Sequence, residues 1–103
     1  MDGLEMIYFN MIAAVGSARS YYMEAIQKAK NGSYVEAEML IKEGHNSFVE
    51  GHRAHSELIT KEASGEAIQV TLLMLHAEDQ MMSAESFGIL AQEFIDVYKK
   101  IGK

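Results

Sequence analysis

Apolar residues recur every three or four positions along three segments of this 103-residue chain, the spacing of one face of an α-helix. The breaks between the segments are Asn31-Gly32-Ser33 and Ala63-Ser64-Gly65-Glu66. Glycine suits the left-handed residue after a helix end, and Ser33 followed by Glu36 predicts a capping box. The pattern therefore predicts three helices, each roughly 45 Å long at 1.5 Å per residue.

Short connections predict antiparallel neighbours, so we expect an all-α, up-down-up three-helix bundle in which residues 1–103 form a single domain. Gly44 and Gly51 lie one heptad apart in the second segment, and this spacing predicts the close approach of a neighbouring helix. The apolar stripes are wide for a bundle of only three helices. We therefore expect the bundle to associate with copies of itself.

Asp79 interrupts the apolar stripe of the third segment. A carboxylate in a core-facing register costs several kcal/mol unless it is paired or neutralised. Two interpretations remain open: a carboxylate bonded at the edge of the core, or a group at a subunit axis where several copies share a proton or a hard cation such as Mg²⁺ or Ca²⁺. The positions predicted to face the core are Ile68, Leu72, Leu75, Asp79, Met82, Ser86, Leu90, Phe94, Val97 and Ile101.

His76 lies three residues before Asp79, beside the stripe, with Gln80 and Ser83 along its own face. It is either a boundary histidine with one satisfied nitrogen or a nucleophile that takes up a phosphoryl group on a neutral imidazole nitrogen. A nucleophile of this kind must be reachable by a second protein if it is to pass the group on.

Three further histidines, His45, His52 and His55, lie in the second segment. The i, i+3 pair His52 and His55 could share a metal, but neither Glu50 nor Glu57 supplies a third ligand at convincing spacing. We therefore interpret the three as surface and boundary residues.

The amino-acid composition excludes several classes of function. The chain has no cysteine, which excludes disulfides, thiolate zinc sites and cysteine nucleophiles, and fits a reducing compartment such as the cytoplasm. The formal net charge of −6 argues against nucleic acid as a partner. No apolar run approaches the roughly 20 residues that a membrane-spanning helix needs, so we expect no membrane insertion. Motifs of a phosphate-cradling glycine loop or a serine triad are also missing, and a reactive histidine without a substrate pocket suits a carrier.

The chain resembles the lactose/cellobiose-type enzyme IIA components of the bacterial phosphoenolpyruvate-dependent sugar phosphotransferase system. The resemblance covers nearly the whole chain, and its most specific part is similar to the family's active-site segment, usually written His-Ala/Gly-Gln-Asp-His-Leu-Met. The matching stretches are Gly16-Ser-Ala-Arg-Ser20, Glu24-Ala-Ile-Gln-Lys-Ala-Lys-Asn-Gly32, Gly51-His52, Glu62-Ala-Ser-Gly-Glu66 and Leu75-His-Ala-Glu-Asp-Gln-Met-Met82.

The resemblance implies a homotrimer of three-helix bundles, nine helices in all, and a role as a phosphotransferase component. His76 matches the histidine that the phosphocarrier HPr phosphorylates at Nε2. The phosphoryl group then passes to a cysteine of the cognate IIB component, and IIC takes up the sugar, here a β-linked disaccharide. Asp79 matches the aspartate that binds a divalent cation, usually Mg²⁺, with one carboxylate from each subunit on the trimer axis. Gln80 and Ser83 are placed to donate hydrogen bonds to the phosphoryl group.

Three residues depart from the family's usual pattern. Glu78 and His55 each stand where glutamine is usual, and Gln80 stands where histidine is usual. Glu78 adds a negative charge near the phosphorylation site, and Gln80 removes a potential positive one. These two changes favour an alternative function, a trimeric helical scaffold or regulator that no longer transfers phosphoryl groups efficiently.

Overall fold

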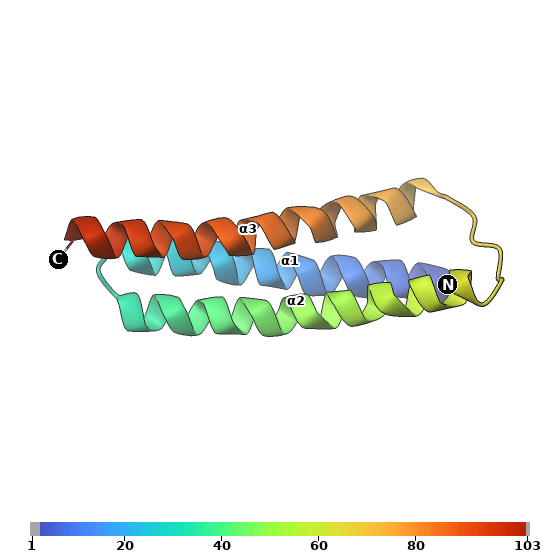
Figure 1. The fold of residues 1–103 in the computed structure, drawn as a ribbon, viewed down its shortest axis with the longest axis horizontal. Coiled ribbons are helices and arrows are strands. Elements are labelled where there is room, and N and C mark those ends of the chain that lie inside the picture. The colour runs from blue at the N-terminus through green and yellow to red at the C-terminus, as the bar shows by residue number, and fades with distance from the viewer. Residues whose placement is uncertain (1–2, 103) are drawn as a thin grey trace.

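The computed structural model describes residues 3–102, which form three long helices: α1 (Gly3–Lys30), α2 (Tyr34–Ala63) and α3 (Leu72–Gly102). Consecutive helices run antiparallel, so α1 and α3 point the same way and the polypeptide leaves at the end of the rod opposite to its start (Figure 1). The rod measures 55 × 21 × 19 Å. No strand occurs within the described range, and the predicted up-down-up helical bundle is confirmed.

Two glycines make the turns that the sequence predicted. Gly32 and Gly65 have φ angles of 81° and 94°, the left-handed region that a residue without Cβ adopts without strain. The capping box predicted at Ser33 is wrong, because the Ser33 side chain makes no capping hydrogen bond. Glu36 instead pairs with Lys28 across the turn, with 3.3 Å between Nζ and Oε2. This ion pair links the end of α1 to the start of α2.

The third helix begins later than the apolar pattern predicted. The pattern extends back to Ile68, yet residues 64–71 form a connection and α3 begins at Leu72. Thr71 Oγ1 accepts a hydrogen bond from the Met74 backbone N–H at 3.2 Å, which satisfies one of the free donors at the helix start. α3 therefore begins directly after the Thr71 cap. The spacing of apolar residues does not locate a helix start of this kind.

The core of the bundle uses a different face of α3 from the one predicted. The predicted stripe is exposed on the single chain: Leu72, Leu90 and Phe94 are 83%, 54% and 48% exposed, and Asp79 is exposed as well. The stripe and the packed face lie side by side, and both have helical spacing, which is why periodicity did not distinguish them. The residues of α3 that pack against the other helices are mostly small: Ala77, Met81, Ala84, Ala91 and Ile95.

Glycines let the helices approach one another around Tyr22. A Cβ atom at Gly44 of α2 would lie 2.5 Å from Tyr22 Cε1, and one at Gly88 of α3 would lie 2.9 Å from Tyr22 Cζ. The Tyr22 ring is thus held between two glycines, and its burial raises the pKa of the hydroxyl above the ordinary value of 10.0. A Cβ at Gly51 would similarly lie 2.7 Å from Val15 Cγ1. The predicted close approach at Gly44 and Gly51 is confirmed.

Replacing Gly44 with alanine is expected to destabilise the protein, even though alanine is the better helix former. The new methyl group would collide with a buried ring that Gly88 confines on its other side, and overpacking of this kind costs about 1–3 kcal/mol. Gly16→Ala is the matched control, because a Cβ at Gly16 meets nothing within 4 Å. Thermal unfolding at one protein concentration should give a lower Tm for Gly44→Ala and an unchanged or higher Tm for Gly16→Ala. Equal increases in Tm would contradict the packing described here.

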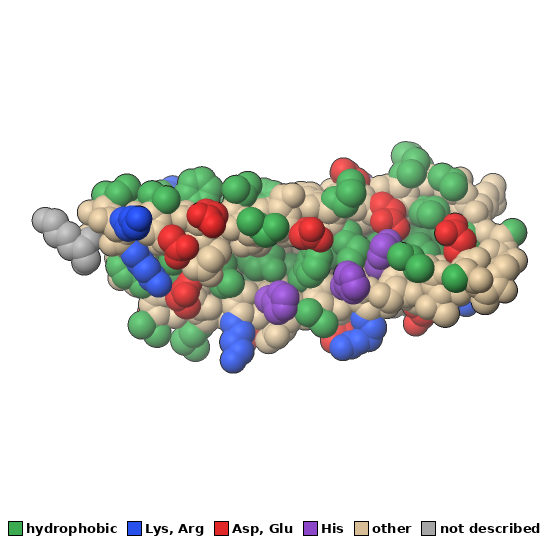
Figure 2. Space-filling view, viewed as in Figure 1, with side chains coloured by type: hydrophobic (Ala, Val, Ile, Leu, Met, Phe, Trp, Pro, Cys, Tyr) green, Lys and Arg blue, Asp and Glu red, His purple; other side chains and the backbone are tan. Residues whose placement is uncertain are grey.

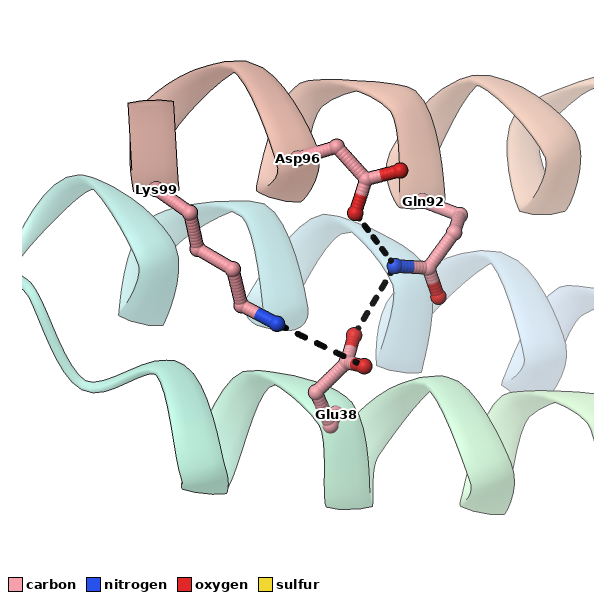
Figure 3. A network of polar contacts seen from close by, with 4 residues as sticks. All are labelled: Glu38, Gln92, Asp96 and Lys99. Atoms are coloured by element: carbon pink, nitrogen blue, oxygen red, sulfur yellow. Dashed lines mark hydrogen bonds and ion pairs between the residues drawn. The ribbon is translucent and has the colours of Figure 1, made fainter. Parts of the chain in front are cut away.

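A small polar network joins the start of α2 to the last turns of α3 (Figure 3). Gln92 Nε2 donates to Glu38 Oε1 at 2.9 Å and to Asp96 Oδ1 at 3.1 Å, and Lys99 Nζ lies 3.7 Å from Glu38 Oε2. These groups are largely exposed, so each contact contributes little to the free energy of unfolding. The network lies at the end of the rod remote from His76.

Candidate functional site

Four side chains form a row along one face of α3: His76, Gln80, Ser83 and Phe87. They are spaced four, three and four residues apart, which places them above one another on successive turns. His76 is exposed, whereas the other three are partly buried against the bundle. The row therefore begins with an imidazole accessible to a second protein and continues into side chains held by packing. This matches the placement that the sequence predicted for Gln80 and Ser83 beside His76.

Arg19 reaches this row from α1. Its Nη1 donates a hydrogen bond to Gln80 Oε1, and its guanidinium carbon lies 5.7 Å from the centre of the Phe87 ring, a cation–π contact. Arg19 thus spans the two turns of α3 that include Ser83. Helical spacing along α3 gives no sign of Arg19, although this residue lies in the Gly16–Ser20 stretch that resembles the family.

Glu78, one of the departures from the family pattern, is paired with another of them. His55 Nε2 of α2 lies 2.8 Å from Glu78 Oε1, with side chains that are 21% and 33% exposed. The carboxylate is therefore directed toward α2. His52 lies close by, with its ring centre 6.4 Å from that of His55. Because Glu78 and His55 lie on different helices, their spacing in the sequence does not predict this contact.

Asp79 lies in the exposed stripe of α3, between Leu75 and Met82. None of the ion pairs found among residues 3–102 includes it. The described residues also contain no group of three histidine, aspartate or glutamate side chains that could hold a metal ion. One chain offers a single carboxylate here, so any further protein ligands of a cation at Asp79 would come from other copies. Oxygen ligands of this kind suit a hard divalent cation.

Hydrophobic side chains follow α3 over much of the visible surface (Figure 2). The exposed apolar members of the stripe are Leu72, Leu75, Met82, Leu90, Phe94, Val97 and Ile101. They run along nearly the whole of α3. A row of exposed apolar side chains of this length, interrupted by Asp79 and Ser86, is typical of a protein interface.

The family model described as "PTS system, Lactose/Cellobiose specific IIA subunit" matches residues 6–99, which include the whole His76 row and Arg19. The chain belongs to this family. The resemblance seen in the sequence is thereby confirmed, and the chain is a phosphotransferase-system IIA component.

Two relatives and one complex illustrate the likeness of this IIA component to known proteins. The lichenan-specific phosphotransferase enzyme IIA component of Bacillus subtilis is 40% identical over 97% of this chain and 91% of its own length. The crystal structure of the cellobiose-specific enzyme IIA of Bacillus anthracis is 41% identical, with a TM-score of 0.96 over 99% of this chain and 94% of that one. The IIA of the Escherichia coli N,N'-diacetylchitobiose branch, solved in complex with HPr, is 25% identical, with a TM-score of 0.79 over the full length of both chains.

The helices of this IIA component are long, but each carries many charged residues. Within residues 3–102, no helix combines the length and the apolar character needed to cross a membrane.

Proposed function

We propose that this IIA component is a phosphoryl carrier that accepts phosphate from phospho-HPr on His76 Nε2 and passes it to a cysteine of a cognate IIB component in the cytoplasm. The transfer would support the uptake and phosphorylation of a β-linked disaccharide through IIC. The observation that carries the proposal is the exposed His76 at the head of a row of hydrogen-bonding side chains on α3. The HPr complex of the E. coli chitobiose IIA supports HPr as the donor.

The transfer needs a neutral imidazole at His76 with its proton on Nδ1. The Nε2 lone pair attacks phosphorus, and the bond between phosphorus and its donor atom on HPr breaks with the electron pair returning to HPr. In the second transfer a thiolate of IIB attacks the same phosphorus, and His76 leaves as the neutral base. Both steps depend on positioning and on stabilising charge at the phosphoryl oxygens, to which Gln80 and Ser83 can donate.

The alternative of a scaffold without transfer rested on Glu78 and Gln80. Both residues have partners in the structure, Glu78 with His55 and Gln80 with Arg19. The contact with His55 directs the Glu78 carboxylate toward α2, and Gln80 keeps an amide N–H that can donate to a phosphoryl group. Phosphoryl transfer is therefore the better supported function.

The proposal is tested by incubating the purified chain with phosphoenolpyruvate, enzyme I and HPr and then measuring its intact mass. One acid-labile phosphoryl group per chain is expected, and it should disappear when the cognate IIB component is added. A chain that gains no phosphoryl group under these conditions would favour the scaffold.

We further propose that three chains assemble through the α3 stripe into a nine-helix homotrimer. Three Asp79 carboxylates would then converge at the axis, where their repulsion requires a shared divalent cation such as Mg²⁺ or a shared proton. The exposed apolar stripe supports the assembly. The position of Asp79 within that stripe supports the cation or shared proton, since burying an unneutralised carboxylate would cost several kcal/mol.

Chelation is expected to lower the thermal stability of the assembly if a cation offsets the repulsion of the Asp79 carboxylates. EDTA should reduce Tm by at least about 4 °C, the shift that about 1 kcal/mol produces in a domain of this size. Asp79→Leu removes the charges together with the need for a cation, so that variant should remain assembled and should not respond to EDTA. An equal response in the two proteins would place the metal elsewhere.

A further inference from the structure

We propose that Arg19 is a phosphoryl-binding residue of the His76 site, supplied by α1 to complete a donor set that α3 begins. The inference rests on the proposed function of His76 and adds a residue to it. Arg19 contacts Gln80 and Phe87, two members of the row that begins with His76. These contacts hold its guanidinium over the turns of α3 that follow the imidazole.

Arg19 is not paired with a carboxylate in any ion pair found among residues 3–102. Three other cations of the bundle pair with carboxylates: Lys28 with Glu36, Arg53 with Glu50, and Lys99 with Glu38. Lys30, Lys42 and Lys100, which lie outside these pairs, are exposed, whereas Arg19 is partly buried. No ion pair among residues 3–102 joins Arg19 to an acid, although the chain has a formal net charge of −6 and 15 acidic residues. Instead the partly buried guanidinium contacts a neutral amide and an aromatic ring. These partners hold it in place and leave its positive charge available for an anion.

The contact with Gln80 also orients the amide NH₂ of Gln80 and the remaining N–H groups of Arg19. Because Gln80 Oε1 accepts from Arg19, the amide NH₂ of Gln80 must point away from the guanidinium, where it can donate to a ligand. Arg19 uses one N–H in this contact, out of about five that a guanidinium carries. His76 lies one helical turn from Gln80, about 6 Å along the axis at 1.5 Å per residue. We therefore expect the amide of Gln80 and the remaining N–H groups of Arg19 to reach a phosphoryl group on His76.

The role of Arg19 in transfer would be electrostatic. As Nε2 of His76 bonds to phosphorus and the bond to HPr breaks, negative charge stays on the three phosphoryl oxygens throughout. A guanidinium can donate two parallel hydrogen bonds to such a group and stabilise it in the transition state and on the phosphorylated protein. Arg19 transfers no proton and forms no covalent bond in this step.

The test compares phosphorylation by phospho-HPr for wild type, Arg19→Gln, Arg19→Lys and Arg53→Gln. Arg53→Gln is the matched control, since it removes the same charge from an exposed site on α2 and so has the same effect on the attraction of HPr at long range. At saturating phospho-HPr, the rate should fall about tenfold or more in Arg19→Gln, recover in part in Arg19→Lys, and change less than about twofold in Arg53→Gln. The ³¹P resonance of phosphorylated His76 should shift in Arg19→Gln, and the phosphorylated variant should hydrolyse faster.

Each result has a definite meaning. If wild type accepts phosphate and Arg19→Gln accepts it at the same rate with an unchanged ³¹P resonance, the assignment of Arg19 is wrong and the carrier function stands. A different result would show that Arg19 only supports the fold. In that case Arg19→Gln and Arg19→Lys would show equal decreases in Tm and equal decreases in the rate of phosphoryl transfer. If wild type accepts no phosphate, the carrier function fails and the assignment fails with it.

Discussion

Replacing His76 with glutamine is expected to abolish phosphoryl acceptance while leaving the bundle folded. Glutamine keeps a polar side chain of similar length at this exposed position, so packing should not change. It removes the lone pair that attacks phosphorus, and no neighbouring side chain in the row is a nucleophile of comparable strength. Intact mass after incubation with phosphoenolpyruvate, enzyme I and HPr should show no added phosphoryl group.

The chain provides its own controls for this experiment. His45→Gln and His52→Gln make the same chemical change at exposed positions of α2 and should accept phosphate at close to the wild-type rate. His55→Gln is less suitable, because it also breaks the contact with Glu78. Acceptance of an acid-labile phosphoryl group by His76→Gln, or its loss in His45→Gln, would assign the reactive nitrogen to another histidine.

Replacing Leu90 with aspartate is expected to convert the proposed homotrimer into monomers. Leu90 is 54% exposed on the single chain, so its side chain contributes little to the core of the bundle. If the α3 stripe is the interface, the substitution removes apolar contact from each chain and adds a buried charge near the axis, at a cost of at least about 3 kcal/mol per chain. Sedimentation velocity should show the mass of a single chain, with helical content unchanged.

The matched control for Leu90→Asp is Val35→Asp. Val35 is also an exposed apolar residue, 77% exposed, but it lies in the first turn of α2, where a carboxylate suits the positive end of the helix. This variant should retain the wild-type mass. Equal masses for Leu90→Asp and wild type would exclude the α3 stripe as the interface.

The sequence predicted the three helices and the glycine turns because both depend on local chemistry. It assigned the wrong face of α3 to the core, because two adjacent faces of that helix carry apolar residues at the same period. Ala77 and Ala84 are small and were not part of the predicted stripe, whereas Leu90 and Phe94 are larger and proved exposed. Which face packs within one chain depends on the distance between the helices. That distance is set by contacts such as Tyr22 between Gly44 and Gly88, which join residues far apart in sequence.

The candidate site was predicted only in part, for a related reason. His76, Gln80 and Ser83 lie on one helix, so helical spacing and the family resemblance were enough to group them. Arg19 and His55 reach the neighbourhood from α1 and α2, and no spacing rule relates them to α3. The substitution of Glu78 looked unfavourable when considered alone. In the structure it lies against the substituted His55, and the two changes together give a contact between helices.

The small residues on the packed face of α3 have a consequence for how the protein folds. α3 buries Met81 and Ile95 but otherwise turns mainly alanine inward, and Leu72, Leu90 and Phe94 would remain in water until the proposed assembly covers them. Folding and association should therefore be coupled, so that the melting temperature rises with protein concentration. In a cell, the amount of folded IIA component would then depend on how much of it is made, and low expression would lower both the number of molecules and the folded fraction.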